Sequence, residues 1–382
     1  MGSRGTAARI GAVLVVAGGA IAFAVCSTSE LPHGTDTPRS AGSTGRPAFP
    51  THKIDAHVHL AVGGERRLLE LMERYGFDHA VDLSGGTPTR GLAAHLAVAN
   101  RLAGKITVFT TLAYEEVRAP GYGARMAEQV EAAHAAGARG LKIAKALGLG
   151  MMRPDGSGVV PVDDPELDVV FETAGRLGMP VAIHTGDPRA FWDPPDAKNE
   201  RLQELSVHPG WLNYGKPVPS FRELADQFER RVARHPRTTF IGVHFGNDAE
   251  EPERVLRMLR AYPNLYVDLA ARIPELGRHP AERLRQIFIE MQDRILYGTD
   301  LGVGPPGEPL MLGSSGADPP TPDEERLFFS ATTRWLETDD RAFAHPTPIQ
   351  GSWTIDGLGL PREVLEKIYW KNAARVIGIT MD

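Results

Sequence analysis

Two histidines that stand two positions apart, His57 and His59, are the side chains of this sequence that point most clearly to chemistry. They end a short segment in which polar and apolar residues alternate. In a β-strand, positions two apart share a face, so the segment would place Asp55, His57 and His59 on one side and the intervening apolar residues on the other. Two imidazoles backed by a carboxylate can supply ligands to one divalent metal ion. An isolated His-x-His pair is as often two unrelated surface histidines, so further ligands must come from elsewhere in the chain.

Later apolar runs end in ionisable side chains that could converge on the same place: Lys142, His184, His244, Asp268 and Asp300. In the runs that end at His184, His244 and Asp268, alternation predicts apolar contacts with outer helices and a polar end that faces inward. Burying several polar groups without partners would cost about 1–3 kcal/mol each. A metal ion and its water would offset that cost, because they give these groups partners. The recurrence therefore favours one metal site over several unrelated polar strand ends.

Short apolar runs alternate with helical patterns from residue 53 onward. The runs predict strands at 53–59, 77–83, 105–112, 139–144, 180–184, 239–244, 264–269 and 294–299. Helical spacing predicts helices at 65–75, 90–102, 122–136, 165–177, 221–235, 251–261, 279–290 and 324–337. Eight strand–helix units over about 300 residues are typical of an α/β fold of the (β/α)₈ or TIM-barrel type. The Gly-x-Gly-x-x-Gly at residues 302–307 does not open a helical pattern, and no phosphate-loop pattern follows a strand, which argues against a nucleotide-binding fold.

Three connections are long, at residues 145–164, 185–220 and 301–323, and each follows a predicted strand. Barrel enzymes form their pockets from such loops, so these insertions would wall the substrate site. The second insertion holds Trp192 and Trp211, which could contact substrate. A loop that packs on its own small core is an equally good interpretation. A last helical pattern at 361–378 predicts a C-terminal helix that closes or covers the barrel.

The first fifty residues differ in composition from the rest. Arg4 and Arg9 precede an uncharged stretch at residues 10–25, which is shorter than the about 20 residues of a membrane span and is typical of a signal peptide. We therefore expect a signal peptide at 1–26, a flexible linker rich in Ser, Thr, Gly and Pro at 27–50, and the barrel at 51–382. Cys26 stands where a lipoprotein would carry its lipid, although the residues before it depart from the lipoprotein pattern.

This N-terminus predicts an exported protein, which would be periplasmic, at the cell surface or extracellular. It would touch a membrane only through the N-terminal segment or a lipid on Cys26. The rest of the chain contains no cysteine, so any metal must be held by nitrogen and oxygen. A net charge of −6, without a Lys/Arg-rich tract, argues against nucleic-acid binding. We expect a small-molecule substrate, and a homo-oligomer is compatible with the sequence.

The pattern as a whole resembles the amidohydrolase superfamily. The likeness rests on the histidine pair of the first strand, the histidines that end the fifth and sixth, the Gly-Thr-Asp ending of the eighth and the closing segment 371–377: His57, His59, His184, His244 and Asp300. It extends over about residues 51–380. The closer match is the amidohydrolase-related branch, which contains decarboxylases of the aminocarboxymuconate-semialdehyde type and assorted hydrolases. These motifs are specific for fold and metal, and they do not identify a substrate.

The resemblance implies that His57, His59, His184 and Asp300 bind one divalent ion, with Zn²⁺ as the expected metal. Water activated by the metal would attack the substrate, and Asp300 would also accept the proton of that water. His244 would orient the water or polarise the substrate carbonyl.

Lys142 has two interpretations under the same resemblance. Binuclear members carry a carboxylated lysine on the fourth strand that bridges two metals, and Lys142 has a comparable position. We favour a single metal, with Lys142 directed toward the substrate or Asp55. Asp55 would lie beside the metal ligands and orient them. Arg272 could hold a substrate carboxylate through its planar guanidinium, or it could pair with a loop acid such as Glu275.

These inferences lead to a metal-dependent hydrolase that cuts an amide, ester or lactone bond of a small substrate. The first alternative is a metal-dependent, non-oxidative decarboxylase, which would need cations such as Arg272 or Lys142 aimed at a carboxylate. The second is a surface binding protein that has lost catalysis. The complete set of ligands argues against it, because binding alone would not require Asp300 and His244 beside the metal histidines.

Overall fold

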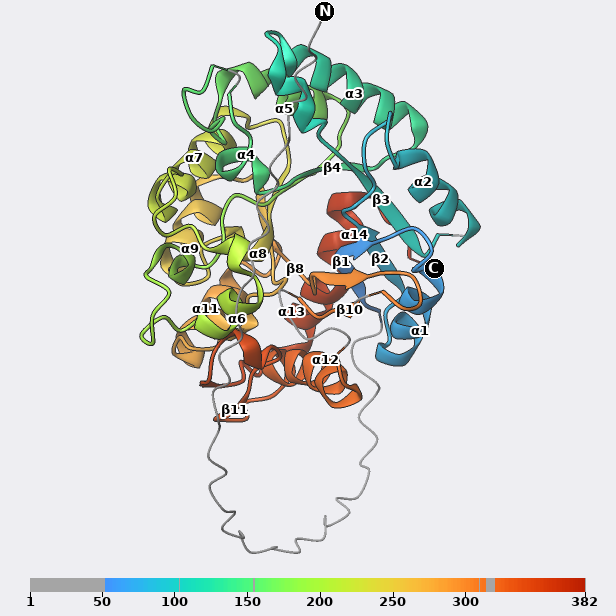
Figure 1. Ribbon diagram of the computed structural model, residues 1–382. Coiled ribbons are helices and arrows are strands. Elements are labelled where there is room, and N and C mark those ends of the chain that lie inside the picture. Colours follow the sequence, from blue (N-terminus) through green and yellow to red (C-terminus); the bar gives the residue numbers. More distant parts are fainter. Residues whose placement is uncertain (1–51, 103, 154, 309, 314–319, 382) are drawn as a thin grey trace, which may run out of the picture. The chain divides into compact units, whose positions relative to one another are not determined.

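The computed structural model describes residues 52–102, 104–153, 155–308, 310–313 and 320–381. The predicted signal peptide, the linker and Cys26 lie outside these residues. The described chain forms a curled sheet of mainly parallel strands with helices around it (Figure 1). Its strands follow the order β10-β9-β1-β2-β3-β4-β5-β6-β7-β8. The predicted α/β fold of the TIM-barrel type is confirmed.

The parallel strands match the predicted ones to within about two residues at most ends. They are β1 (Ile54–Leu60), β2 (His79–Asp82), β3 (Ile106–Thr111), β4 (Gly140–Ile143), β5 (Val181–Ile183), β6 (Phe240–Gly242), β7 (Leu265–Asp268) and β8 (Ile295–Leu296). After β8, the chain continues into β9 (Leu301–Val303), which forms a hairpin with β10 (Leu310–Met311). A separate hairpin joins β11 (Phe343–Ala344) to β12 (Thr354–Ile355). The sequence patterns did not predict these hairpins.

The barrel closes between the β8–β9 segment and β1. β9 pairs in parallel with β1, with Val58 opposite Leu301. In the segment between β8 and β9, Tyr297 O accepts a hydrogen bond from Ala56 N–H at 3.0 Å, and Asp300 N–H donates to His57 O at 2.9 Å. The first and last parallel strands of the barrel are therefore joined by backbone hydrogen bonds close to the two histidines.

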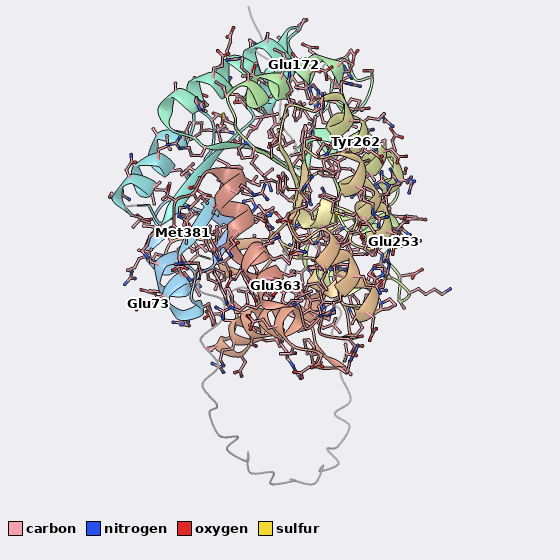
Figure 2. All side chains as sticks on the ribbon, turned by 180° about the vertical axis from the view of Figure 1, so that it is seen from behind. Glu73, Glu172, Glu253, Tyr262, Glu363 and Met381 are labelled. Atoms are coloured by element: carbon pink, nitrogen blue, oxygen red, sulfur yellow. The ribbon has the colours of Figure 1, made fainter. Side chains whose placement is uncertain are left out.

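Long amphipathic helices surround the strands. They are α1 (Glu65–Tyr75), α2 (Leu92–Arg101), α3 (Tyr122–Ala136), α5 (Asp168–Arg176), α7 (Phe221–Arg234), α9 (Pro252–Ala261), α11 (Ala281–Glu290) and α12 (Pro322–Glu337). Short helices lie in the loops: α4 (Ala146–Leu149), α6 (Leu202–Val207), α8 (Val243–Gly246) and α10 (Ile273–Leu276). Charged side chains such as Glu73, Glu172 and Glu253 project from the outer helices into solvent (Figure 2). Within the described ranges, none of the helices has the length and apolar character needed to cross a bilayer.

The C-terminal segment covers one end of the barrel. It consists of α13 (Arg362–Glu366), a π-helical turn (Lys367–Lys371) and α14 (Asn372–Ile377), where the sequence predicted one helix. Seen from behind, this segment lies across the sheet between Glu363 and Met381 (Figure 2). Ala373 and Ile377 of α14 pack on apolar side chains of the barrel interior. The histidines lie toward the other end of the barrel, so α14 closes the end away from them.

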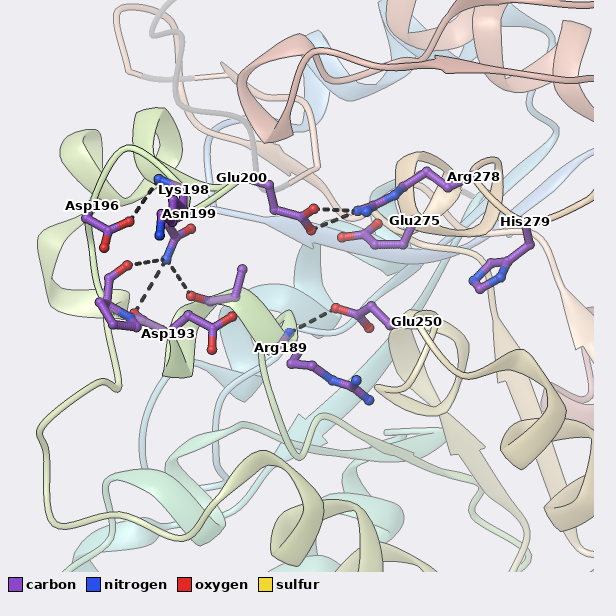
Figure 3. Close-up of a pocket in the computed structure, with 12 residues that line it drawn as sticks. Arg189, Asp193, Asp196, Lys198, Asn199, Glu200, Glu250, Glu275, Arg278 and His279 are labelled. Atoms are coloured by element: carbon purple, nitrogen blue, oxygen red, sulfur yellow. Dashed lines mark hydrogen bonds and ion pairs between the residues drawn. The ribbon is translucent and has the colours of Figure 1, made fainter.

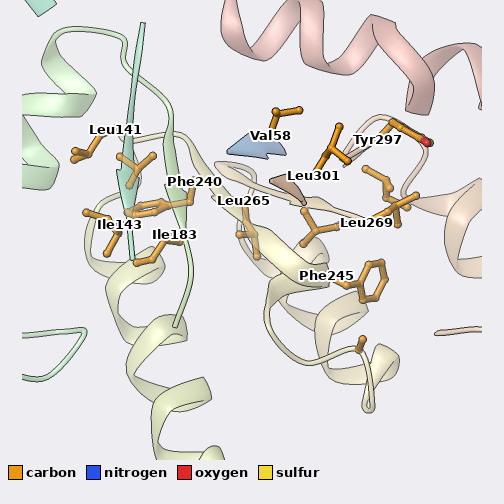
Figure 4. Packing of buried hydrophobic residues seen from close by; sticks show 14 of the residues in the cluster. Val58, Leu141, Ile143, Ile183, Phe240, Phe245, Leu265, Leu269, Tyr297 and Leu301 are labelled. Carbon is orange, nitrogen blue, oxygen red and sulfur yellow. The ribbon is translucent and has the colours of Figure 1, made fainter. Parts of the chain in front are cut away.

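Two layers of apolar side chains hold the barrel. The larger lies between the strands and the helices and includes Val58, Leu141, Ile183 and Leu265 (Figure 4). The smaller fills the interior and includes Val81, Phe109, Ala182, Ile241 and Leu296. In β5, Val181 and Ile183 belong to the outer layer and Ala182 to the inner one, so the predicted alternation holds there.

The alternation predicted for β1 is wrong in one respect. The pairing of β1 with β2 shifts between Asp55 and Val58, which marks a bulge. Ile54 and Ala56 accordingly belong to the interior layer, whereas Val58 belongs to the outer layer. A bulge adds a residue to one strand and redirects the side chains that follow it, a feature often found beside active sites. Asp55 and the two histidines therefore do not share one regular strand face.

Replacing Gly140 by alanine is expected to destabilise the barrel. A Cβ at this position would lie 2.3 Å from Cζ of Phe109, whose ring fills the interior. Because the core leaves no room for the ring to move, we expect a loss of about 1–3 kcal/mol in the free energy of unfolding, measured by chemical denaturation. Gly150→Ala is the control, since its nearest contact would be 3.7 Å away. Equal effects of the two substitutions would contradict this description of the core.

Candidate metal centre and substrate cavity

Three donor atoms at the carboxyl end of the barrel form a nearly equilateral triangle. His57 Nε2 lies 3.3 Å from His59 Nε2 and 3.2 Å from Asp300 Oδ1, and His59 Nε2 lies 3.3 Å from Asp300 Oδ1. Ligands bound about 2.0–2.1 Å from one tetrahedral ion are roughly 3.3–3.4 Å apart. Donor atoms of His57, Asp300 and His244 also lie within 4.8 Å of one another. The separations and the nitrogen–oxygen donor set fit a single divalent cation.

His57, which is fully buried, is held from two sides. Its Nδ1 lies 2.9 Å from Asp268 Oδ2, and its Nε2 lies 3.2 Å from Lys142 Nζ. Burial and the Lys142 charge lower the pKa of His57, but Asp268 and Asp300 raise it more, so the net shift is upward. An imidazole that favours a positive charge between two carboxylates is in a suitable environment for a metal cation.

Lys142 lies inside the site. Burial lowers the pKa of its ammonium to about 8, against the opposing attraction of Asp300 and Asp268. The sequence left two partners open for this lysine, the substrate and Asp55, and in the structure its nearest polar contact is His57 Nε2. A lysine that loses its proton near neutral pH can act as a donor, a ligand or a nucleophile.

His59 and His184 differ in which ring nitrogen is hydrogen-bonded to a neighbouring residue. His59 is half-buried, and its Nδ1 lies 2.7 Å from Ser84 Oγ, which orients the ring so that Nε2 meets Asp300. The ring of His184 stands 4.4 Å from that of His244, but its Nε2 lies 2.9 Å from Gly186 O. Because a carbonyl only accepts, His184 Nε2 carries a proton and Nδ1 is the nitrogen available to an ion.

His244 and Asp300 reach the site through left-handed backbone turns. Their φ angles are 57° and 65°, a region that non-glycine residues seldom adopt. Asp268 Oδ1 accepts a hydrogen bond from His244 N–H at 2.7 Å, which holds the first turn. His244 Nδ1 donates to Ala270 O at 2.8 Å, so its Nε2 is free to accept. The prediction that His244 ends a regular strand is wrong: β6 stops at Gly242, and strained backbone of this kind is concentrated at functional sites.

Asp55 organises the backbone of the site. Its carboxylate accepts hydrogen bonds from Thr299 Oγ1 at 2.6 Å, from Thr299 N–H at 3.0 Å and from its neighbour His57 N–H at 3.1 Å. Burial raises the pKa of Asp55 to about 7, although these hydrogen bonds oppose the shift. Asp55 therefore ties β1 to the residue before Asp300 and touches no imidazole ring.

A cavity of about 190 Å³ opens directly in front of the candidate metal centre. His59, His184, His244, Arg272 and Asp300 line its inner part. The loops that follow β4 and β5, together with strand β10, complete its lining through Lys145, Asp187, Phe191, Trp211 and Met311. Of the two tryptophans predicted to contact substrate, only Trp211 lines this cavity. Trp192 instead donates its Nε1–H to Pro219 O and packs edge-on against Phe221, as a self-packed loop would.

Arg272 also lines this cavity and is buried. The alternative interpretation, in which Arg272 pairs with Glu275, is wrong. Glu275 pairs with Arg201, which also donates to Glu204 at 2.7 Å, and all three side chains are buried. Burial holds the pKa of His184 well below its usual value, and the positive charges of His244, Lys142, Lys145 and Arg272 add smaller contributions in the same direction. His184 is thus a neutral imidazole, the form that binds metals.

A larger cavity, of about 760 Å³, lies on the far side of the β5 loop. Some of its charged lining residues contact one another: Arg278 pairs with Glu200, and the Arg189 backbone N–H donates to Glu250 (Figure 3). It holds none of the clustered histidines, so the smaller cavity is the better candidate for the reaction site.

Sequence reasoning missed three features of the site. Asp268 was predicted only as the ionisable end of a strand, without its contacts with His57 and the His244 backbone. Ser84, which follows β2, and the Lys145–Asp187 ion pair were not identified. Ser84 and Asp187 do follow predicted strands, so position alone could have drawn attention to them. Their partners could not have been identified, because these contacts join distant parts of the chain.

Comparison with known proteins gives a consistent fold. A family model described as Amidohydrolase matches residues 54–379. No curated protein matches the chain. A crystal structure of 2,6-dihydroxybenzoate decarboxylase with 2,6-dihydroxybenzoate is 15% identical, covers 86% of this chain and 100% of its own, and has a TM-score of 0.50.

Two further solved structures are similar to the same extent. An uncharacterized TIM-barrel protein from Bordetella bronchiseptica is 17% identical over 86% of this chain and 98% of its own, with a TM-score of 0.51. A putative amidohydrolase from Staphylococcus aureus is 15% identical over 86% of this chain and 100% of its own, with a TM-score of 0.51. These structural similarities establish a shared fold. Because the sequence identities are only 15–17%, they carry no information on the reaction.

Proposed function

The chain belongs to the amidohydrolase family, and we propose that it is a metal-dependent hydrolase of an amide, ester or lactone bond in a small substrate. The observation that carries the proposal is the donor triangle of His57, His59 and Asp300, which borders a small cavity. His184 lines the same cavity and would be the fourth ligand of one divalent cation, for which Zn²⁺ is the expected metal. When bound, such a cation polarises a substrate carbonyl and makes a water molecule more acidic.

Asp300 is the residue proposed to accept the proton of the attacking water. Burial alone would raise the pKa of its carboxyl, but the charge of His57 and hydrogen bonds from His57 and His59 hold that pKa well below its usual range. Asp300 lines the cavity, so the carboxylate is within reach of substrate and water. His244 donates Nδ1–H to Ala270 O, so its Nε2 can accept a hydrogen bond, and it is proposed to hold the attacking water in place.

A second candidate function is non-oxidative decarboxylation. The observation that favours it is the presence of two cations, Arg272 and Lys142, beside the candidate metal centre. One of the structural neighbours, which shares the fold, is a 2,6-dihydroxybenzoate decarboxylase. A panel of esters, lactones, amides and aromatic carboxylates, assayed in parallel for hydrolysis and for CO₂ release, separates the two functions. Release of CO₂ from a carboxylate, without hydrolysis of any compound in the panel, would make decarboxylation the better-supported function.

Metal analysis of the purified protein is expected to find close to one equivalent of a divalent metal. The expectation follows from the single donor triangle of His57, His59 and Asp300. Removing the metal with a chelator should abolish activity, and adding one equivalent of Zn²⁺ should restore it. Two equivalents, together with a carboxylated Lys142 in intact-mass spectra, would instead support a binuclear centre.

We also propose that the protein is exported and acts outside the cytoplasm. The proposal rests on the charged and then apolar pattern of residues 1–26. Mass spectrometry of the mature N-terminus from the native host tests it. A chain that begins after residue 26 without added mass indicates secretion, a lipid on Cys26 indicates anchoring, and an intact Met1 would contradict cleavage.

A further inference from the structure

We infer that Arg272 binds the single anionic group of the substrate, so that the enzyme selects small monoanions over neutral molecules and over dianions. The inference rests on the proposed function and adds the charge of the substrate to it. The substrate bond that reacts would face His57, His59 and Asp300. The substrate carboxylate would bind Arg272 and would not itself react.

Arg272 is a buried cation whose hydrogen-bonding capacity is largely unused. Its side chain is 3% exposed and lines the cavity together with His184 and His244. Within the described part of the chain, its guanidinium donates one hydrogen bond, to Ala271 O at 2.8 Å, and forms no ion pair. A guanidinium carries five N–H donors in a planar fork that matches a carboxylate. Burial of such a group without an acid partner is unfavourable, and an anion in the cavity would supply the partner.

The nearby acids are already engaged. Glu275 lies three residues after Arg272, and it pairs with Arg201, as does Glu204. Because both acids pair with Arg201, they leave the N–H groups of Arg272 free to bind in the cavity.

The second cation of the cavity is not free in the same way. Lys145 Nζ lies 2.7 Å from Asp187 Oδ1 and 5.1 Å from the ring centre of Trp211. A second anion at Lys145 would have to displace Asp187 or lie against it, and like charges in a partly buried site repel strongly. Of the two cationic side chains that line the cavity, Arg272 is therefore the one that is free to bind an anion.

The remaining walls limit size and polarity. The cavity volume of about 190 Å³ corresponds to roughly six water molecules, at about 30 Å³ each. Phe191, Trp211 and Met311 supply apolar surface to its lining. A compact molecule with a flat or apolar body and one carboxylate fits these walls.

The test is a binding measurement on the metal-loaded, full-length protein by isothermal titration calorimetry. The probes are benzoate, its neutral counterpart benzamide and the dianion isophthalate. We expect benzoate to bind at least about ten-fold more tightly than benzamide, and isophthalate to bind no more tightly than benzoate. In Arg272→Met, benzoate should bind about ten-fold more weakly, and its advantage over benzamide should disappear.

Arg278→Met is the matched control, because Arg278 pairs with Glu200 at the larger cavity and should leave all three affinities unchanged. Metal content is measured for each variant, so that an effect of losing the bound metal is not mistaken for an effect of losing the Arg272 guanidinium. The inference is wrong if benzoate does not bind the wild type, if its advantage over benzamide survives in Arg272→Met, or if isophthalate binds much more tightly than benzoate. These binding measurements do not depend on catalysis. If benzoate binding depends on Arg272 but no substrate is hydrolysed, the inference about Arg272 stands and only the proposed hydrolase function is contradicted.

Discussion

Asp300→Asn is expected to lower kcat by about 10²–10⁴-fold, the range that a positioned general base contributes. An amide cannot accept the proton that the carboxylate takes from water, and the lost negative charge also weakens the hold of His57 and His59 on a cation. The amide oxygen keeps the size and position of Oδ1, so the barrel should stay folded. The measurement is steady-state kinetics with the substrate that the panel identifies, accompanied by metal analysis and thermal unfolding.

Asp187→Asn is the matched control for Asp300. Asp187 is a second carboxylate of the same cavity, but its partners are Lys145 and, at 4.0 Å, His184 Nε2, and none of the three residues of the donor triangle. It should change KM and leave kcat within a few-fold of the wild type. Retention of more than a tenth of kcat in a metal-loaded Asp300→Asn protein would contradict the role given to Asp300.

Asp268→Asn is expected to weaken metal binding by about 10- to 100-fold, the usual effect of losing a group that orients a metal ligand. A carboxylate only accepts hydrogen bonds, so Asp268 Oδ2 fixes the proton of His57 on Nδ1 and leaves the Nε2 lone pair facing the site. In the variant, the amide oxygen can keep the bonds to His244 N–H and Ala270 N–H. The amide nitrogen then faces His57 Nδ1 and favours the other tautomer, whose Nε2–H cannot bind a cation.

Competition with a chelating dye measures the affinity, and the nitrogen chemical shifts of His57 report the tautomer. Asp55→Asn is the control, because Asp55 is equally buried but accepts only from Thr299 and from backbone N–H. It should keep metal affinity within a few-fold. If Asp268→Asn kept the metal affinity of the wild type, or if Asp268→Asn and Asp55→Asn lost affinity equally, control of the His57 tautomer by Asp268 would be contradicted.

The fold could be predicted because strand–helix alternation has a simple physical cause. Each strand must bury one face under a helix and the other in the interior, so the apolar period changes from two to 3.6 at each boundary. Helices at 65–75 and 122–136 were predicted with the bounds of α1 and α3. The C-terminal helix was predicted without its π-helical turn, because residues on both sides of the turn keep the helical pattern.

The predicted ligands could be named from the sequence, but their geometry could not. The bulge in β1 and the left-handed turns at His244 and Asp300 leave no periodic signal, since they arise at non-glycine residues held by distant partners. The role of Asp268 depends on contacts 24 and 211 residues away in the chain. Arg272 was a candidate with two partners, and only the pairing of Glu275 with Arg201 distinguished between them.

The most direct test of the proposed metal centre is a crystal structure of the metal-loaded protein with anomalous diffraction at the zinc edge. We expect one strong anomalous peak within about 2.0–2.2 Å of His57 Nε2, His59 Nε2 and an oxygen of Asp300, at the inner end of the cavity that Arg272 lines. A peak away from these atoms, or none in a protein that carries one equivalent of zinc, would contradict the proposed centre.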